Sequence, residues 1–160
     1  MKIGIISDTH DNIKITKRAC DLFMKHGVEM VIHAGDFASR EILDLFREFN
    51  CKFVYGNADI NIDRLNEKCK EIGIDCLSET CEIIAEEKRI LVMHGNVIKV
   101  FRDAVASGNY DYIIKGHTHH FENYLSNNTR VINPGSAFGT KENSIAVLDT
   151  YDDSVEKILI

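Results

Sequence analysis

Short apolar runs alternate with amphipathic segments along the first 73 residues of the chain. The apolar runs are continuous and rich in β-branched residues, as is typical of strands buried on both faces, and they span 2–7, 29–35 and 51–56. The segments between and after them carry apolar residues at helical spacing, and they span 11–27, 39–49 and 60–73. Gly27 and Gly73 end two of these segments, where helix C-caps favour glycine. The pattern predicts three successive strand–helix units.

The pattern becomes richer in strands after residue 80. One predicted helix ends at Gly108, and Pro134 is expected in a turn between strands. The helix is expected at 97–108, and the strands at 81–87, 88–94, 110–116, 121–127, 129–135, 144–150 and 155–160. This order predicts a single α/β domain over residues 1–160, either a sandwich around one mixed sheet or two packed sheets covered by helices.

Composition narrows the classes of protein that remain. With 160 residues, 44% of them hydrophobic, the chain is long enough to bury a core. A net charge of −6 argues against a protein that tracks a nucleic-acid backbone, so nucleic acid is not expected as the principal partner. An anionic substrate stays compatible with this charge if bound cations supply positive charge locally.

Location is inferred from apolar runs and cysteines. No apolar run approaches the roughly 20 residues of a membrane span, and the first residues lack the pattern of a secretory signal, so no membrane partner is expected. The five cysteines form no C-x-x-C pair, which favours a reducing cytoplasm over a disulfide framework. A redox role is left open for three of them, Cys69, Cys76 and Cys81.

Five predicted strands run directly into residue types that bind metal ions. In open α/β sheets ligands bind at the carboxyl ends of the strands, so these side chains are expected to converge at one rim. Asp59 lies two positions after Asn57, which follows the predicted strand at 51–56. The converging set is Asp8, His10, Asp36, Asn57, His94, His117 and His119.

Seven nitrogen and oxygen ligands exceed what one tetrahedral site requires, and they suit two metal ions that share a bridging carboxylate. A ligand set without cysteine favours manganese, nickel, cobalt, iron or zinc over a structural thiolate zinc site. Most of these motifs also have a purely structural reading, such as an aspartate N-cap at Asp8 or a buried core histidine at His94, and only "GHTH" (116–119) resists one. The metal hypothesis depends on their joint placement at strand ends.

In this order, the motifs "DTH" (8–10), "GD" (35–36), "GN" (56–57), "HG" (94–95) and "GHTH" (116–119) resemble the calcineurin-like metallophosphoesterases. "INPGS" (132–136) resembles the segment that closes their compact bacterial and archaeal phosphodiesterase branch. The resemblance implies a four-layer αββα sandwich of two mixed sheets flanked by helices. It also implies a divalent-metal phosphodiesterase that hydrolyses small-molecule phosphodiesters by attack of a metal-bridging hydroxide.

The same resemblance implies the metal ligands. Two divalent ions, manganese first among the candidates, would be held by two sets that share Asp36: Asp8, His10, Asp36 and His119 for one, and Asp36, Asn57, His94 and His117 for the other. Asn57, Asp59 and His94 are the expected catalytic residues, with Asp59 orienting a histidine such as His10. A homodimer or homotetramer is also implied.

The chain departs from the family at two positions where many members carry histidine, Ala58 and Asn96. Loss of an acid there predicts slow turnover and a preference for acidic leaving groups. Two alternatives stay open: a phosphomonoesterase or pyrophosphatase with the same metals, and a non-catalytic protein-interaction scaffold of the same fold.

Overall fold

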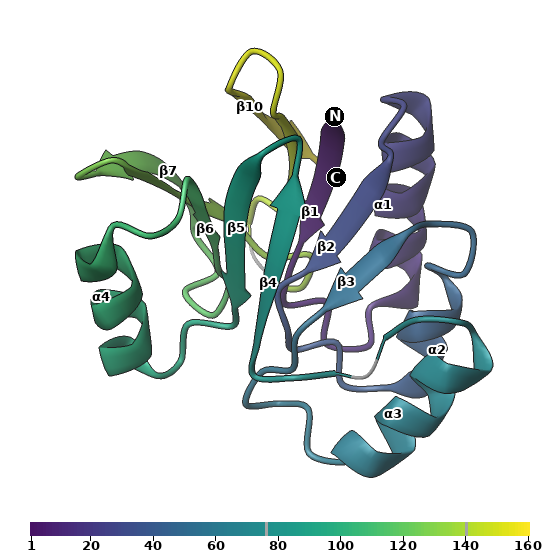
Figure 1. Cartoon of the computed structure of the whole chain (residues 1–160). Coiled ribbons are helices and arrows are strands. Elements are labelled where there is room, and N and C mark those ends of the chain that lie inside the picture. Colours follow the sequence, from purple (N-terminus) through teal and green to yellow (C-terminus); the bar gives the residue numbers. More distant parts are fainter. Residues whose placement is uncertain (76, 140) are drawn as a thin grey trace.

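The computed structural model describes residues 1–75, 77–139 and 141–160, so Cys76 lies outside the described residues. Two five-stranded mixed sheets pack face to face, with helices on their outer surfaces (Figure 1). This arrangement confirms the predicted four-layer αββα sandwich. Of the two architectures left open by the sequence, the structure has two packed sheets and not a single mixed sheet.

The first sheet has the strand order β10-β9-β1-β2-β3. Its parallel strands are β1 (Lys2–Ile6), β2 (Met30–His33) and β3 (Cys51–Phe53), and the antiparallel strands β9 (Ser144–Asp149) and β10 (Ser154–Leu159) extend one edge. Every residue of β2 is buried, because a sheet covered on both faces has no solvent-facing side.

The second sheet has the order β4-β5-β6-β8-β7. Its parallel strands are β5 (Lys88–Met93), β6 (Tyr112–Ile114) and β8 (Thr129–Pro134), and its antiparallel edge strands are β4 (Thr80–Ala85) and β7 (Phe121–Ser126). The carboxyl ends of the parallel strands of both sheets point to the same edge of the sandwich (Figure 1).

Three apolar layers hold the sandwich together. The helices α1 (Ile13–Lys25), α2 (Arg40–Asp44) and α3 (Ile62–Glu71) cover the first sheet, and α4 (Ile98–Ser107) lies against the second (Figure 1). The layer between the sheets includes Ile5, Ile32, Val92 and Ile114. Within the described part of the chain, no helix is long and apolar enough to cross a bilayer.

Two local predictions from the sequence were wrong. The helix expected over 39–49 ends at Asp44, because turns after it insert the fully buried Phe46 edge-on against His33 and Phe53. Pro134 is not in a turn but is the last residue of β8, paired with Phe121 of β7, where a strand end tolerates the missing N–H.

Candidate metal centre

The loops that follow the parallel strands are tied together by hydrogen bonds. Within the first sheet the backbone N–H of Asp8 donates to Gly35 O at 3.0 Å. Between the sheets, His94 Nδ1 lies 2.8 Å from Ala34 O, and the backbone N–H of His117 donates to Asp8 Oδ2 at 3.1 Å. The predicted rim therefore exists, and residues of both sheets meet there.

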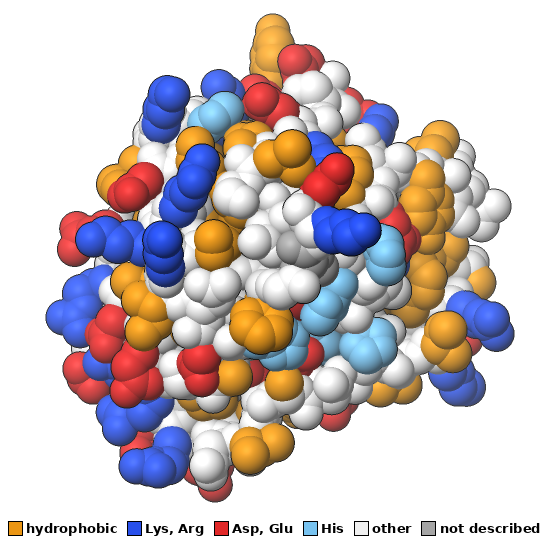
Figure 2. Space-filling model, turned by 180° about the vertical axis from the view of Figure 1, so that it is seen from behind, with side chains coloured by type: hydrophobic (Ala, Val, Ile, Leu, Met, Phe, Trp, Pro, Cys, Tyr) orange, Lys and Arg blue, Asp and Glu red, His pale blue; other side chains and the backbone are white. Residues whose placement is uncertain are grey.

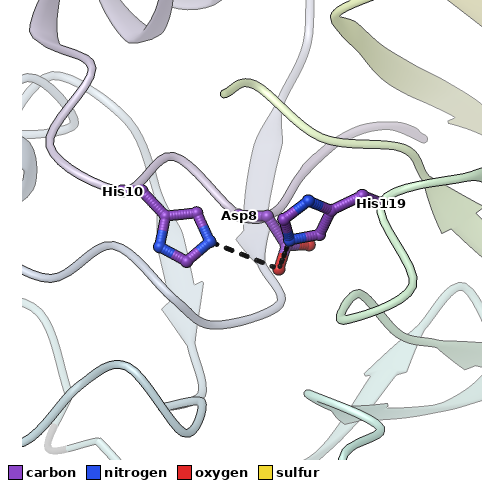
Figure 3. Close-up of side chains that lie close together, drawn as sticks. All are labelled: Asp8, His10 and His119. Atoms are coloured by element: carbon purple, nitrogen blue, oxygen red, sulfur yellow. Dashed lines mark ion pairs between the residues drawn. The ribbon is translucent and has the colours of Figure 1, made fainter. Parts of the chain in front are cut away.

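One group of ligand-type side chains surrounds Asp8 at the end of β1. His119 Nε2 lies 3.2 Å and His10 Nε2 4.0 Å from Asp8 Oδ1. Figure 3 shows both imidazoles directing a nitrogen at this oxygen from separate loops. Ligand atoms of these three residues lie within 4.8 Å of one another, close enough to coordinate one ion.

A second group is centred on Asp36 at the end of β2. Its Oδ2 lies 3.3 Å from His94 Nε2 and 3.7 Å from His10 Nε2. Asp8, Asp36 and His94 also have ligand atoms within 4.8 Å of one another. The Asp36 carboxylate thus lies between the two groups, where a bridging ligand would have to be.

His117 and Asn57 lie beside this second group. The rings of His117 and His94 are 5.2 Å apart between centroids and are nearly perpendicular. Asn57 lines a pocket together with His94. The structure therefore brings five predicted ligands into direct proximity and places the remaining two at the His94 side.

Two polar atoms at the centre are buried without a hydrogen-bond partner. They are Asp8 Oδ1 and His94 Nε2, in residues that are 0% and 1% exposed. A buried polar atom that stays unsatisfied costs about 1–3 kcal/mol. Since both atoms face neighbouring ligand-type side chains, coordination of cations would satisfy them, and this donor set of carboxylate oxygens and imidazole nitrogens fits borderline divalent metals.

Burial and neighbouring charges shift the pKa values of these groups in different directions. Burial raises the pKa of Asp8 above its usual value, although nearby histidines oppose it. Burial also acts to raise the pKa of Asp36, but the nearby His94 and the Ala58 N–H lower it overall. Burial acts to lower the pKa of His94, yet the Asp36 carboxylate raises it above its usual value. The Asp36 carboxylate thus favours a positive charge at His94, as it would favour a cation bound there.

The backbone at the centre is strained. Five of the predicted ligands have positive φ, between 39° and 70°, in the left-handed region that few side chains adopt: Asp8, His10, Asp36, His117 and His119. Gly56 and Gly116 are required nearby, because a Cβ at Gly56 would lie 2.1 Å from Asp36 Oδ1 and one at Gly116 1.9 Å from Ser7 Oγ. Such strain is common at functional sites, where it aims side chains inward.

The expectation that Asp59 orients His10 was wrong. Its carboxylate is 4% exposed and accepts the backbone N–H groups of Asp36 at 2.8 Å, Ala38 at 2.7 Å and Gly56 at 2.8 Å. Burial raises the pKa of Asp59, and these three donors partly offset the effect. Asp59 therefore fixes the loops that carry Asp36 and Asn57.

Two further residues support the centre, although neither was among the predicted site residues. His33 is fully buried, with Gly35 N–H donating to its Nδ1 and Thr9 Oγ1 3.1 Å from its Nε2, so it connects the loops that bear Asp8 and Asp36. Asn133 donates to Gly116 O at 2.8 Å and to Thr118 Oγ1 at 3.0 Å. In the sequence, only the "INPGS" segment (132–136) drew attention to Asn133. Nothing in the sequence indicated that Asn133 would contact Gly116 and Thr118.

The face that carries the centre combines histidines with apolar groups. Figure 2 shows pale blue histidine side chains gathered on one face, next to hydrophobic ones. One apolar neighbour is Phe138, 43% exposed, whose ring centroid lies 5.2 Å from that of His10.

Comparisons with known proteins agree with this geometry. Residues 1–153 match the model of the calcineurin-like phosphoesterase superfamily domain. Phosphodiesterase MJ0936 of Methanocaldococcus jannaschii is 34% identical over 100% of this chain and 99% of its own. Among solved structures, an archaeal phosphodiesterase is 33% identical with a TM-score of 0.92, and each chain is covered completely. A Vps29 single mutant from Entamoeba histolytica, 20% identical, with 100% and 98% coverage and a TM-score of 0.73, shares the fold.

Proposed function

Because the chain belongs to the calcineurin-like phosphoesterase superfamily, we propose that it is a phosphodiesterase that hydrolyses small-molecule phosphodiesters at a centre of two divalent metal ions. The observation that carries the proposal is the pair of unsatisfied buried atoms, Asp8 Oδ1 and His94 Nε2, in two residues whose ligand atoms lie within 4.8 Å of that of Asp36. A relative of full-length similarity that is named a phosphodiesterase supports the substrate class.

In this proposal Asp36 would be a ligand shared by the two metal sets. Asp8, His10 and His119 complete the first set, and Asn57, His94 and His117 the second. When bound, the two cations would acidify a water molecule and offset the charge of the phosphoryl oxygens. Manganese is the first candidate, with nickel, cobalt, iron and zinc as alternatives. We also propose a cytoplasmic location and a homodimer or homotetramer.

Hydrogen bonds within the chain orient the proposed ligands. His94 is held by Ala34 O, which fixes the ring and leaves Nε2 facing the centre. The Ala58 N–H donates to Asp36 Oδ1 at 2.8 Å, which directs Oδ2 toward His10 and His94. Asn57 lines the adjoining pocket, and we propose that it orients a phosphoryl oxygen.

Position 58, where the family resemblance implies a histidine, carries no general acid. The side chain there is a methyl group, and Asn96 cannot donate a proton as an acid. The leaving oxygen must then depart largely without protonation. The proposed enzyme therefore favours leaving groups of low pKa, such as aryl phosphodiesters.

The test is metal reconstitution. Chelator-treated protein receives manganese, nickel, cobalt, zinc or magnesium, and hydrolysis of bis(4-nitrophenyl) phosphate is compared with that of 4-nitrophenyl phosphate. We expect two ions per chain by elemental analysis and higher activity on the diester. Preference for the monoester would change the substrate class, and two bound ions without hydrolysis would favour a scaffold.

Two variants make the test specific. His117→Ala should lower metal content and activity, because it removes a proposed ligand. His120→Ala is the matched control, since His120 is an exposed histidine on the same loop outside the proposed ligand sets. Equal loss in both variants would argue against the ligand assignment.

A further inference from the structure

A pocket opens beside the second proposed ligand set. It lies between the loop after β3 and the segment from β5 to α4, and His94 and Asn57 form one side of it. A ligand in this pocket would therefore lie directly beside the proposed metal centre. Of the residues that line this pocket, Gly56, Asn57 and His94 also belong to the centre described above, and the others have no role there.

Part of the pocket lining is apolar. Val97 and Val100, at the start of α4, are 52% and 42% exposed, and Met93 and the ring of Tyr55 extend this surface. Exposed apolar side chains gathered at a concave site mark a surface that binds an apolar group.

The polar part of the pocket is negative. Glu79 lines it, and burial followed by the nearby charge of Glu79 raises the pKa of Tyr55. The backbone N–H of Tyr55 donates to Ser78 O at 3.1 Å, which fixes the segment bearing Glu79 beside the end of β3. Among the described residues that line this pocket there is no lysine or arginine.

We infer that this pocket binds one ester group of the phosphodiester, and that it selects an apolar group, uncharged or positively charged, over a group with a second negative charge. The inference rests on the proposed function and deepens it. Diesters whose ester group carries a further phosphate or carboxylate are then poor substrates, because Glu79 repels the second anion and no cation in the pocket compensates.

The first experiment measures kcat/KM of the manganese-loaded enzyme with three 4-nitrophenyl phosphodiesters. The second ester group is phenyl, 2-(trimethylammonio)ethyl or 2-carboxyethyl. We expect the cationic ester to exceed the anionic one by about tenfold. Glu79→Lys should reverse this ratio. The matched control is Glu67→Lys, an equal charge change at an exposed position of α3, and it should leave the ratio as it is.

A second pair of variants tests the apolar wall. Val100→Asp should lower kcat/KM for the phenyl ester about tenfold or more relative to the wild type. Ile98→Asp is the control, because Ile98 is exposed on the same helix but does not line the pocket. A cation-to-anion ratio unchanged by Glu79→Lys, or equal effects at Val100 and Ile98, would overturn the inference.

A binding measurement separates this inference from the proposed function. Phenyltrimethylammonium and benzoate are titrated into the metal-free protein and followed by amide NMR shifts. The cation should shift the amides of Tyr55, Asn96 and Val97, while benzoate should not, and Glu79→Lys should abolish the response. Binding without hydrolysis of any diester would reject the proposed function and keep the pocket; hydrolysis without binding or discrimination would reject the pocket alone.

Discussion

Replacing Asp59 by asparagine tests whether one buried carboxylate holds the loops of the metal centre in place. Asp59 Oδ2 accepts the N–H groups of Asp36 and Gly56, and Oδ1 accepts that of Ala38, all at 2.7–2.8 Å. Asparagine has nearly the same shape, so it keeps the packing. It offers one acceptor oxygen in place of two and carries no charge.

The expected loss in the free energy of unfolding follows from these three hydrogen bonds. With its oxygen at the Oδ2 position, asparagine keeps two hydrogen bonds but loses the charge assistance of each, about 1 kcal/mol apiece. Its amide group then faces the Ala38 N–H, which loses its acceptor at a further cost of about 1–3 kcal/mol. Removing a buried charge offsets part of this, so the expected loss is about 2–4 kcal/mol in the free energy of unfolding.

The assay is urea unfolding of the metal-free protein. The dependence of the free energy of unfolding on urea concentration is compared between variants, because an unchanged slope means that only stability has changed. For a chain of this size the loss corresponds to a melting temperature about 5–15 °C lower. Asp63→Asn is the control, because Asp63 is an exposed aspartate in the first turn of α3, and its effect should stay within about 0.5 kcal/mol. If both variants unfold at the same urea concentration, Asp59 does not anchor the loops.

Three other perturbations probe the site. Gly56→Ala should lower diesterase activity by at least about tenfold, because its Cβ would meet Asp36 Oδ1 at 2.1 Å, whereas Gly73→Ala, with open space around it, tests backbone strain alone; equal activity in the two would refute this. Burial, followed by the nearby His94, lowers the pKa of His33 to about 3, while an unfolded histidine titrates near 6.5. The unfolded chain therefore binds more protons between these values, and stability falls as the pH falls; from pH 7 to 5 the wild type should lose about 2 kcal/mol more than His33→Gln in urea unfolding. Ala58→His should raise kcat most for alkyl leaving groups by supplying an acid, and equal or lower activity on alkyl and aryl diesters would count against it.

The strands and the positions of the ligands at their ends followed from local pattern. β-Branched runs such as the one that forms β1 have few alternatives to a buried strand, and parallel strands direct their carboxyl ends to one edge. The position of Asp8 at the rim therefore needed no tertiary information. The early end of α2 did need it, because the burial of Phe46 against His33 overrides the helical spacing beyond Asp44.

The role of Asp59 could not be read from the sequence. A carboxylate next to a ligand motif has several nearby partners, and the choice between His10 and three backbone N–H groups depends on loop conformation. That conformation includes positive φ at Asp36 and Ala38, which aspartate adopts only occasionally and alanine rarely. The pocket beside His94 could not be predicted for a related reason. Glu79 and Val100 are distant in sequence, and both line the pocket only because β4 pairs with β5.

The spacing of the two proposed ligand sets is determined by the core as well as by the loops. Asp8 follows a strand of the first sheet and His117 one of the second, and a hydrogen bond of 3.1 Å joins them across the rim. The sheets that carry them are held apart by the apolar layer around Ile5 and Ile114. Since packed interiors transmit small volume changes, a change in the thickness of this layer would alter the distance between the ligand sets without touching a ligand. The distance between the two ligand sets thus depends on the packing between the sheets. The local motifs determine only which side chains lie at the edge of the sandwich.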